Sequence, residues 1–322
     1  MNQTDYAYGV SYIRSIENRL MDKGDIEGLI MTKTPEEAMR MLNDKGYSNE
    51  IVSPSEYEKL LSNQQSLCWE TVREVAPVGA PLDILLYKND FHNLKVVIKA
   101  IFSNRKDYES MFLKPATVDT EVIVNAISDK DFSVLPEMLR AAAERGYEAL
   151  ANTEDSQLLD IITDKAAMDY TMKCAEISKS EFIEDLIRLE NTLADIKIAY
   201  RAMKTEKNAD FLKQALSEKS GLSREALISA SLSGEDALLS YISQNGFEEA
   251  ANALKISVSE YEKYQDRTKN VFVQKASYIT LGAEPLIAYI LKKQAELLSV
   301  RIIMSCKING FSESVIRERL RD

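Results

Sequence analysis

The stretch of sequence that decides the fold is NLKVVIKA at residues 93–100, because similar stretches return twice later in the chain. The later copies are DIKIAYRA at 195–202 and SVRIIMSC at 299–306. Each copy begins with a polar residue, continues with an aliphatic residue and a cation, and then runs on with mainly apolar residues. The copies lie about 100 residues apart, and such self-similarity is typical of a chain built from repeated units.

A glycine followed by an aromatic residue recurs with the same spacing. The pairs are Gly46-Tyr47, Gly146-Tyr147 and Gly246-Phe247. Before each glycine, apolar residues lie four, seven and eight positions back, which places them on one face of a helix. Glycine readily adopts the left-handed backbone that ends many helices. The pattern therefore predicts that a helix ends at each of these glycines.

Helix-start signals and the scarcity of turn residues indicate a helical chain throughout. The 322 residues include only 11 glycines and 7 prolines. N-terminal capping patterns occur at residues 34–37, 53–56 and 257–260, and we expect the short β-branched run at 121–124 to be helical as well. The sequence predicts an all-α fold with three similar helical domains, 1–115, 116–219 and 220–322. The repeats alone leave open a pseudo-threefold arrangement or an extended solenoid.

The composition excludes several classes of function. The formal net charge of −11 opposes binding to nucleic acid. A single histidine, His92, excludes metal sites that need several imidazoles, and no base–nucleophile pair accompanies it. Cys68, Cys174 and Cys306 are too widely spaced for a zinc or redox motif, so we expect buried thiols. No phosphate-binding glycine motif occurs. We therefore expect no catalytic, cofactor or metal site.

Membrane insertion is not expected either. The first residues are polar and acidic, whereas a signal peptide begins with a basic region and an apolar run. No stretch approaches the 18 or so apolar residues of a membrane span. We expect a protein with no direct membrane span.

One run of residues carries a resemblance to a known family. Asp90-Phe91-His92-Asn93-Leu94 resembles the D-x-H-N-L signature of the C subunit of V/A-type (archaeal-type) ATPases, which is related to the d subunit of eukaryotic V-ATPases. The likeness extends over the full length, through an opening helix at 6–20, an element at 35–47 and final helices at 296–320. The middle repeat departs mildly, with Asp195 where the first repeat has Asn93 and no histidine.

The resemblance implies a non-catalytic part of a rotary machine. In this family, three similar helical domains form a pseudo-threefold funnel on the cytoplasmic face of the membrane rotor ring. The funnel is a socket for the shaft formed by the D and F subunits, while other subunits hydrolyse or synthesise ATP. The protein would thereby help to couple ATP turnover to proton or sodium transport. The alternative is a helical-repeat scaffold or adaptor; an all-helical enzyme is disfavoured because no Asp-Asp-x-x-Asp run occurs.

Equivalent cations in the three repeats are the candidate partner-contact residues. They are Lys95, Lys197 and Arg301. Either they line the funnel and meet the shaft or the ring, or they lie along their own helices and pair with nearby carboxylates. For His92 and Asn93 we expect a structural role, such as capping or hydrogen bonding across a helix pair.

Overall fold

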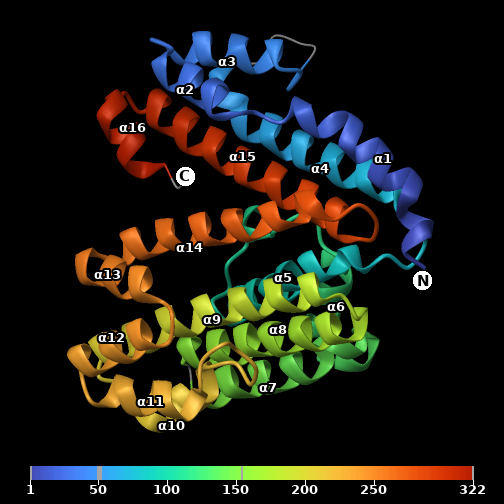
Figure 1. Ribbon diagram of the computed structural model, residues 1–322. Helices are drawn as coiled ribbons and strands as arrows, with labels where there is room; N and C mark the ends of the chain where they lie inside the picture. Colours follow the sequence, from blue (N-terminus) through green and yellow to red (C-terminus); the bar gives the residue numbers. More distant parts are fainter. Residues whose placement is uncertain (1, 49–52, 154, 321–322) are drawn as a thin grey trace. The chain divides into compact units, whose positions relative to one another are not determined.

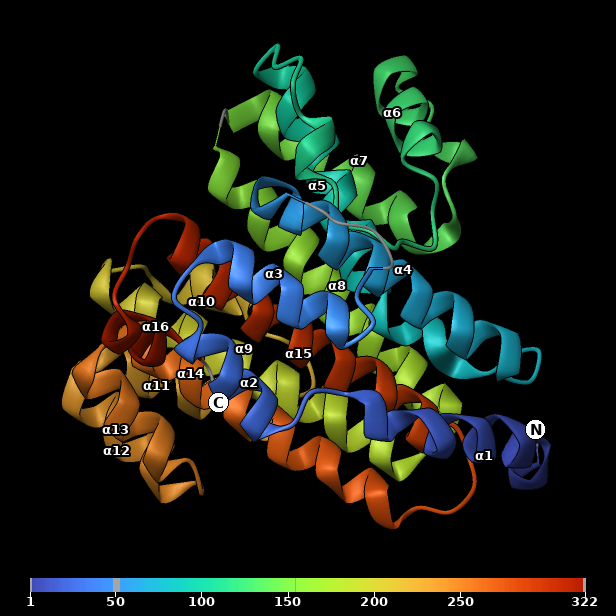
Figure 2. The same cartoon turned by 90° about the horizontal axis from the view of Figure 1, so that it is seen from above.

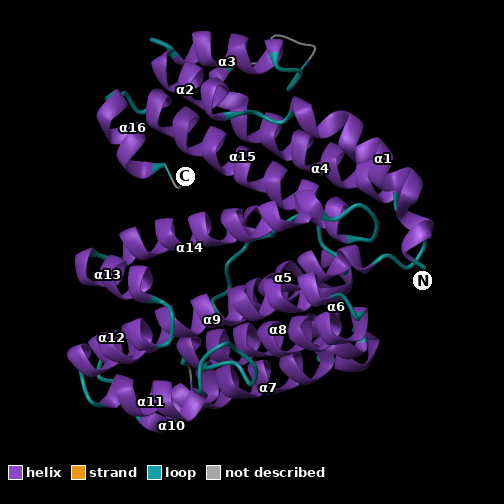
Figure 3. Cartoon of the chain, in the orientation of Figure 1, coloured by secondary structure: helices purple, strands orange, loops and turns teal. Residues whose placement is uncertain are grey.

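Helices and 3-10 turns make up all the regular structure in the residues that the computed structural model describes, 2–48, 53–153 and 155–320 (Figure 3). Helix α3 (Pro35–Asp44) begins as predicted, since Thr34 Oγ1 accepts a hydrogen bond from the Glu37 amide at 3.2 Å. Helix α14 (Val258–Val273) and helix α6 (Thr120–Asp129) also lie where the sequence predicts them. After Ser53 there is first a 3-10 turn, and the Ser53 hydroxyl makes no capping bond. The prediction of an all-α fold is confirmed.

The chain divides into two compact units. Unit 1 comprises residues 1–80 and 259–322, and unit 2 comprises residues 81–258. Unit 1 is therefore built from both ends of the chain (Figure 1). The predicted domains 1–115, 116–219 and 220–322, and their arrangement as a pseudo-threefold funnel, stay predictions.

Unit 1 is organised around the long helix α15 (Glu284–Ile308), which contacts most of its other helices (Figure 2). The core contains Leu29, Leu42, Leu61 and Ile303, all fully buried. The remaining helices are α1 (Ala7–Ile16), α2 (Lys23–Met31), α3, α4 (Tyr57–Val75), α16 (Glu313–Arg319) and α14, of which all but Val258 belongs to this unit.

Unit 2 is organised around helix α8 (Ser156–Ser178), which contacts α5 (Tyr87–Phe102), α7 (Glu137–Thr153) and α9 (Glu181–Lys204). Shorter helices complete the unit: α6, α10 (Ala209–Ala215), α11 (Arg224–Leu232), α12 (Glu235–Gln244) and α13 (Glu248–Ile256). Short 3-10 turns in the two units lie at Gln3–Tyr6, Glu17–Arg19, Pro54–Glu56, Pro81–Leu85, Glu109–Met111, Phe132–Val134 and Gln274–Tyr278.

The three repeated stretches lie in three long helices. Residues 93–100 belong to α5, residues 195–202 to α9 and residues 299–306 to α15. The apolar run of each copy faces the interior, as the buried residues Ile98, Ala199 and Ile303 show. In all three helices, the repeated stretch thus carries a cation near its start and buries its apolar face.

Two of the three predicted glycine helix ends are confirmed. Gly46 and Gly246 have φ angles of +83° and +91° and follow the last turns of α3 and α12. The next amides, of Tyr47 and Phe247, reach back to helix carbonyls at 3.1 and 3.2 Å. The left-handed backbone therefore ends these helices as the sequence predicts.

The prediction is wrong for Gly146, where helix α7 continues to Thr153. A Cβ at Gly146 would lie 2.6 Å from Leu159 Cδ1 of α8 and 3.6 Å from Ile98 Cδ1 of α5. Glycine at this place allows α7 to pack closely against α8 and α5. Gly146 thus permits close packing between helices and does not end a helix.

We predict that Gly146→Ala destabilises the protein, because Leu159 is fully buried and has little room to move. Overpacking of this kind costs roughly 1–3 kcal/mol. Thermal or urea unfolding measures the loss. Gly24→Ala, at an exposed helix position, is the control and should change stability by less than about 0.5 kcal/mol; equal effects of the two substitutions would contradict the packing explanation.

Candidate functional site

Lys95 forms ion pairs between two helices of unit 2. Its Nζ lies 2.7 Å from Asp164 Oδ1 and 3.7 Å from Asp160 Oδ1, both on α8. Lys99, one turn further along α5, also pairs with Asp160 at 2.6 Å. The side chain of Lys95 is largely buried against its neighbours. Lys95 therefore helps to hold α5 against α8.

Arg301 forms the corresponding contact in unit 1. Its Nε lies 3.0 Å from Glu58 Oε2 of α4, in a pair that is exposed on both sides. Lys197, half-buried on α9, also interacts within the chain. Pairing with nearby carboxylates is thus shown for Lys95 and Arg301, and contact of the three cations with a partner stays a prediction.

The D-x-H-N-L segment on α5 holds the irregular chain that follows the helix. Asp90, fully buried, accepts hydrogen bonds from the Thr117 and Val118 amides at 2.8 and 2.9 Å and from the Thr117 hydroxyl at 2.6 Å. Asn93 donates to the Leu113 carbonyl at 3.0 Å and accepts from the Leu113 amide at 2.8 Å. These bonds supply partners that the loop backbone would otherwise lack.

His92 makes a bond of the same kind, since its Nε2 lies 3.2 Å from the Met111 carbonyl oxygen. The three polar side chains of the segment, Asp90, His92 and Asn93, therefore all bind the backbone of residues 111–118. His92 and Asn93 thus have structural contacts, but these bind the irregular segment after α5; neither the expected capping nor a bond across a helix pair is what the structure shows for them.

Helix α9 holds its own following segment in the same way. Asp195 accepts hydrogen bonds from the Ser217 amide at 3.0 Å and the Ser217 hydroxyl at 2.7 Å. Thr192 Oγ1 accepts from the Gly221 amide at 2.7 Å. Asp195 thus binds a following segment, as Asn93 does in the first repeat. Both partners of Asp195 are donors, which suits a carboxylate, whereas Asn93 also donates to a carbonyl.

The third repeat carries Glu296 at the position of Asp90 and Thr192. Its Oε2 accepts from the Met21 amide at 2.7 Å, and its Oε1 accepts from the Tyr47 hydroxyl and, at 2.6 Å, from Lys293 Nζ. Lys293 Nζ also lies 4.5 Å from the centre of the Tyr47 ring. Through Glu296, helix α15 is thus joined to the segments that contain Met21 and Tyr47.

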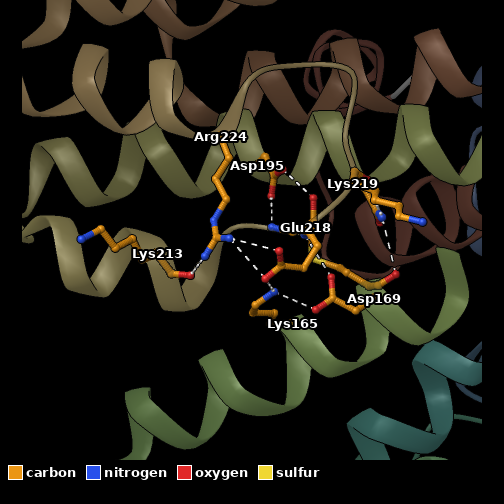
Figure 4. Close-up of polar contacts among 10 residues, drawn as sticks. Lys165, Asp169, Asp195, Lys213, Glu218, Lys219 and Arg224 are labelled. Atoms are coloured by element: carbon orange, nitrogen blue, oxygen red, sulfur yellow. Dashed lines mark hydrogen bonds and ion pairs between the residues drawn. The ribbon is translucent and has the colours of Figure 1, made fainter. Parts of the chain in front are cut away.

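Ion pairs bind the exposed Glu218 in residues 216–223, the segment between α10 and α11 (Figure 4). Glu218 lies 2.9 Å from Lys165 and 3.2 Å from Arg224, and its amide donates to Asp169 at 3.1 Å. Asp169 in turn pairs with Lys165 at 2.7 Å. Together with the bonds of the buried Asp195 to Ser217, these contacts attach the irregular segment to both α8 and α9.

Burial changes the titration of several of these groups. It raises the pKa of Asp195 to about 6, although the hydrogen bonds from Ser217 act in the opposite direction. Burial also raises the pKa of Asp90, against the bonds from Thr117 and Val118. The pKa of the Cys68 thiol is raised to about 12 by burial, so this cysteine is a poor nucleophile.

Two further observations concern metals and membranes. Among the residues that the structure describes, no three His, Cys, Asp or Glu side chains are grouped so that they could hold a metal ion. Within the same residues, no helix combines the length and the apolar character needed to cross a bilayer.

The fold and these buried hydrogen bonds define an all-helical protein in which long helices bind irregular chain through their polar side chains. Comparison with known proteins is more specific. The model of the ATP synthase (C/AC39) subunit family matches residues 10–319. The chain belongs to this family, as the D-x-H-N-L segment indicates.

Two characterised relatives agree with this membership. The chain is 23% identical over 316 residues to the C subunit of the V-type sodium ATPase of Enterococcus hirae, covering 96% of each protein. It is 22% identical over 350 aligned positions to the C subunit of the A-type ATP synthase of Methanocaldococcus jannaschii, covering 98% of this chain and 86% of the relative.

We predict that the stability of the protein depends on pH through Asp195. Its folded-state pKa of about 6 lies above the ordinary value of 3.8, so the ionised form disfavours folding above that pH. Stability should rise as the pH falls from 7 to 5, by about 1 kcal/mol relative to Asp195→Asn, which cannot titrate.

Urea unfolding at several pH values measures this difference. Asp185→Asn, an exposed carboxylate of the same helix, is the matched control and should keep the pH dependence of the wild type. Parallel stability curves for wild type and Asp195→Asn would show that the carboxyl of Asp195 is not responsible.

Proposed function

We propose that this protein is a non-catalytic central-stalk subunit of a V/A-type ATPase or ATP synthase. It would act as the socket between the shaft of D and F subunits and the membrane rotor ring. In this place it couples ATP hydrolysis or synthesis to the transport of protons or sodium ions. The observation that carries the proposal is the family match over residues 10–319, with two relatives that are both C subunits.

The hydrogen bonds and ion pairs within the chain are consistent with a subunit that transmits torque. A socket must resist deformation, and irregular segments are the parts of a protein that deform most easily. In this chain the segments after α5 and α9 are bound to the helices by Asp90, Asn93 and Asp195. Ion pairs of Glu218 add to these bonds. A protein braced in this way can transmit force between two partners without catalysing a reaction.

The proposal places the protein at the cytoplasmic face of the membrane, where the rotor ring would hold it. Docking on a ring requires no membrane span in the docking protein. In this arrangement the three repeats form a pseudo-threefold funnel, and an extended scaffold or adaptor is the competing architecture.

Reconstitution tests the proposal. We expect the purified protein to bind both the D–F complex and the detergent-solubilised ring, and ATP-driven ion transport to lose its coupling when the protein is left out. Binding and transport assays with and without the protein measure both effects. Transport that stays fully coupled without the protein, or a protein that binds neither partner, would contradict the proposal.

Scattering tests the shape. We expect small-angle X-ray scattering to give a compact particle, as three domains about an axis require. An elongated arc would instead support the scaffold alternative.

The candidate cations provide a residue-level prediction. Arg301→Gln removes an exposed ion pair with Glu58, and exposed pairs contribute about 0–1 kcal/mol, so the fold should be nearly unaffected. If Arg301 contacts the shaft or the ring, binding of that partner weakens several-fold. Glu58→Gln removes the same internal pair and is the control. Equal effects of both variants on partner binding would assign Arg301 to internal pairing alone.

A further inference from the structure

Helix α16 is attached to the rest of unit 1 by few contacts. It folds back beside the end of α15 and packs against α15 and α2 (Figure 1). Within Glu313–Arg319, only Ile316 is buried, with 1% of its surface exposed, and it belongs to the apolar core of the unit. A helix this short is not stable in water by itself. The contacts with α2 and α15 therefore decide whether α16 stays in place.

An ion pair at the surface supplies the main polar contact with α2. Arg317 Nη1 donates to Glu27 Oε2 of α2 at 2.7 Å, and Nη2 donates to the other oxygen of the same carboxylate. Nη2 also donates to Glu313 of α16 at 2.7 Å. The side chains of Arg317 and Glu27 are 41% and 40% exposed. Because the pair is reached by water, dissolved salt screens it and weakens the attachment.

The chain that joins α15 to α16 is exposed along its whole length. Residues 308–314 all lie at the surface, and Gly310 has a φ angle of +69°. Segments with few buried contacts open at a lower free energy than the core of the same protein. Helix α16 can therefore swing away from the unit through this connection while α15 keeps its place in the core.

The site that α16 covers is apolar and contains a thiol. Cys306 of α15 is 2% exposed and belongs to the same core cluster as Ile316 and Ile30 of α2. Arg319 Nη1 lies 4.0 Å from Cys306 Sγ, and the Arg319 guanidinium lies 4.5 Å from the centre of the Phe311 ring. The last turn of α16 thus lies over Cys306. Movement of α16 away from the unit would expose this thiol to water.

We propose that α16 opens reversibly from α2 and α15, and that the ion pair of Arg317 with Glu27 sets how often it opens. In the closed form, Ile316 fills the apolar site beside Cys306. In the open form, this site and the thiol are accessible while the rest of unit 1 stays folded. The surface that unit 1 presents here is then controlled by an ion pair that salt can screen. The inference concerns this chain alone and does not depend on the proposed function.

Thiol labelling of the full chain measures the opening. The protein is treated with N-ethylmaleimide under native conditions, and peptide mass spectrometry follows each cysteine separately. Cys68, 6% exposed on α4, reports opening of unit 1 as a whole. Cys174, half-buried in unit 2, is an internal standard that should react equally in all variants of unit 1.

Three variants separate the contacts of α16 from the rest of the unit. Arg317→Gln removes the ion pair with Glu27, and Ile316→Ala removes most of the buried side chain. Arg301→Gln removes an equally exposed ion pair of α15 that does not involve α16, and it is the matched control. Labelling of each protein is compared at low and high concentrations of sodium chloride.

We expect Cys306 of the wild type to react about tenfold faster than Cys68, although Cys306 is the more deeply buried of the two. High salt should accelerate the labelling of Cys306 several-fold. Arg317→Gln should accelerate it to a similar extent at low salt and remove the salt dependence, whereas Arg301→Gln should change neither. Ile316→Ala should accelerate it more strongly than Arg317→Gln, because it removes the buried anchor of α16.

Two results would overturn the inference. Equal labelling of Cys306 and Cys68 in the wild type would show that Cys306 becomes accessible only when the whole unit opens. Labelling of Cys306 that neither salt nor Arg317→Gln changes would show that the ion pair does not control α16. Melting temperatures reveal whether Ile316→Ala still folds, and Arg317→Gln, a substitution at the surface, keeps the test decisive if it does not.

Discussion

The structure depends on buried side chains that accept hydrogen bonds from irregular backbone. Asp90, Thr192 and Glu296 lie at the same place in the three repeats, and each accepts a bond from a backbone amide of a non-helical segment. A backbone amide that is buried without a hydrogen-bond acceptor destabilises the folded state. These segments can therefore pack against helices only where such acceptors exist. Each of the three similar stretches therefore lies in a helix that binds irregular chain through a buried acceptor.

The acceptor differs in each repeat because its surroundings differ. Asp90 faces two amides and a hydroxyl, which a carboxylate can satisfy, whereas Thr192 accepts from the Gly221 amide. Glu296 also accepts from Tyr47 and Lys293, and the nearby ammonium group compensates a charge that burial would otherwise disfavour. Asp195 is bound by the neutral groups of Ser217, which compensate its burial only in part, and its pKa is raised to about 6.

The candidate cations show how one sequence position can serve different purposes. Lys95 is largely buried between α5 and α8 and pairs with two carboxylates, so its charge is already used inside unit 2. Arg301 is more exposed, and its guanidinium pairs with Glu58 at the surface. The sequence pattern made the two equivalent, but their different burial makes Arg301 the better candidate for contact with a partner.

Local sequence signals predicted the helices well and the tertiary contacts poorly. Thr34 and Gly46 act on their own helix, so their effects could be predicted from neighbouring residues. Gly146 has the same local pattern as Gly46, yet it lies inside α7 because Leu159 and Ile98 approach it from other helices. Likewise, no local signal shows that Asp195 binds Ser217 or that Glu296 binds Met21, since these partners are distant in the chain.

The sequence by itself determined that the protein is helical, that three similar stretches recur about 100 residues apart and that the chain resembles the C subunits of V/A-type ATPases. These features follow from periodicity, capping residues and a short motif, which depend on neighbours along the chain. Only the tertiary structure decided what the motif does, where the cations find their partners and which apolar residues stay exposed. Those outcomes depend on burial and on contacts between segments distant in the sequence, and both exist only in the folded chain.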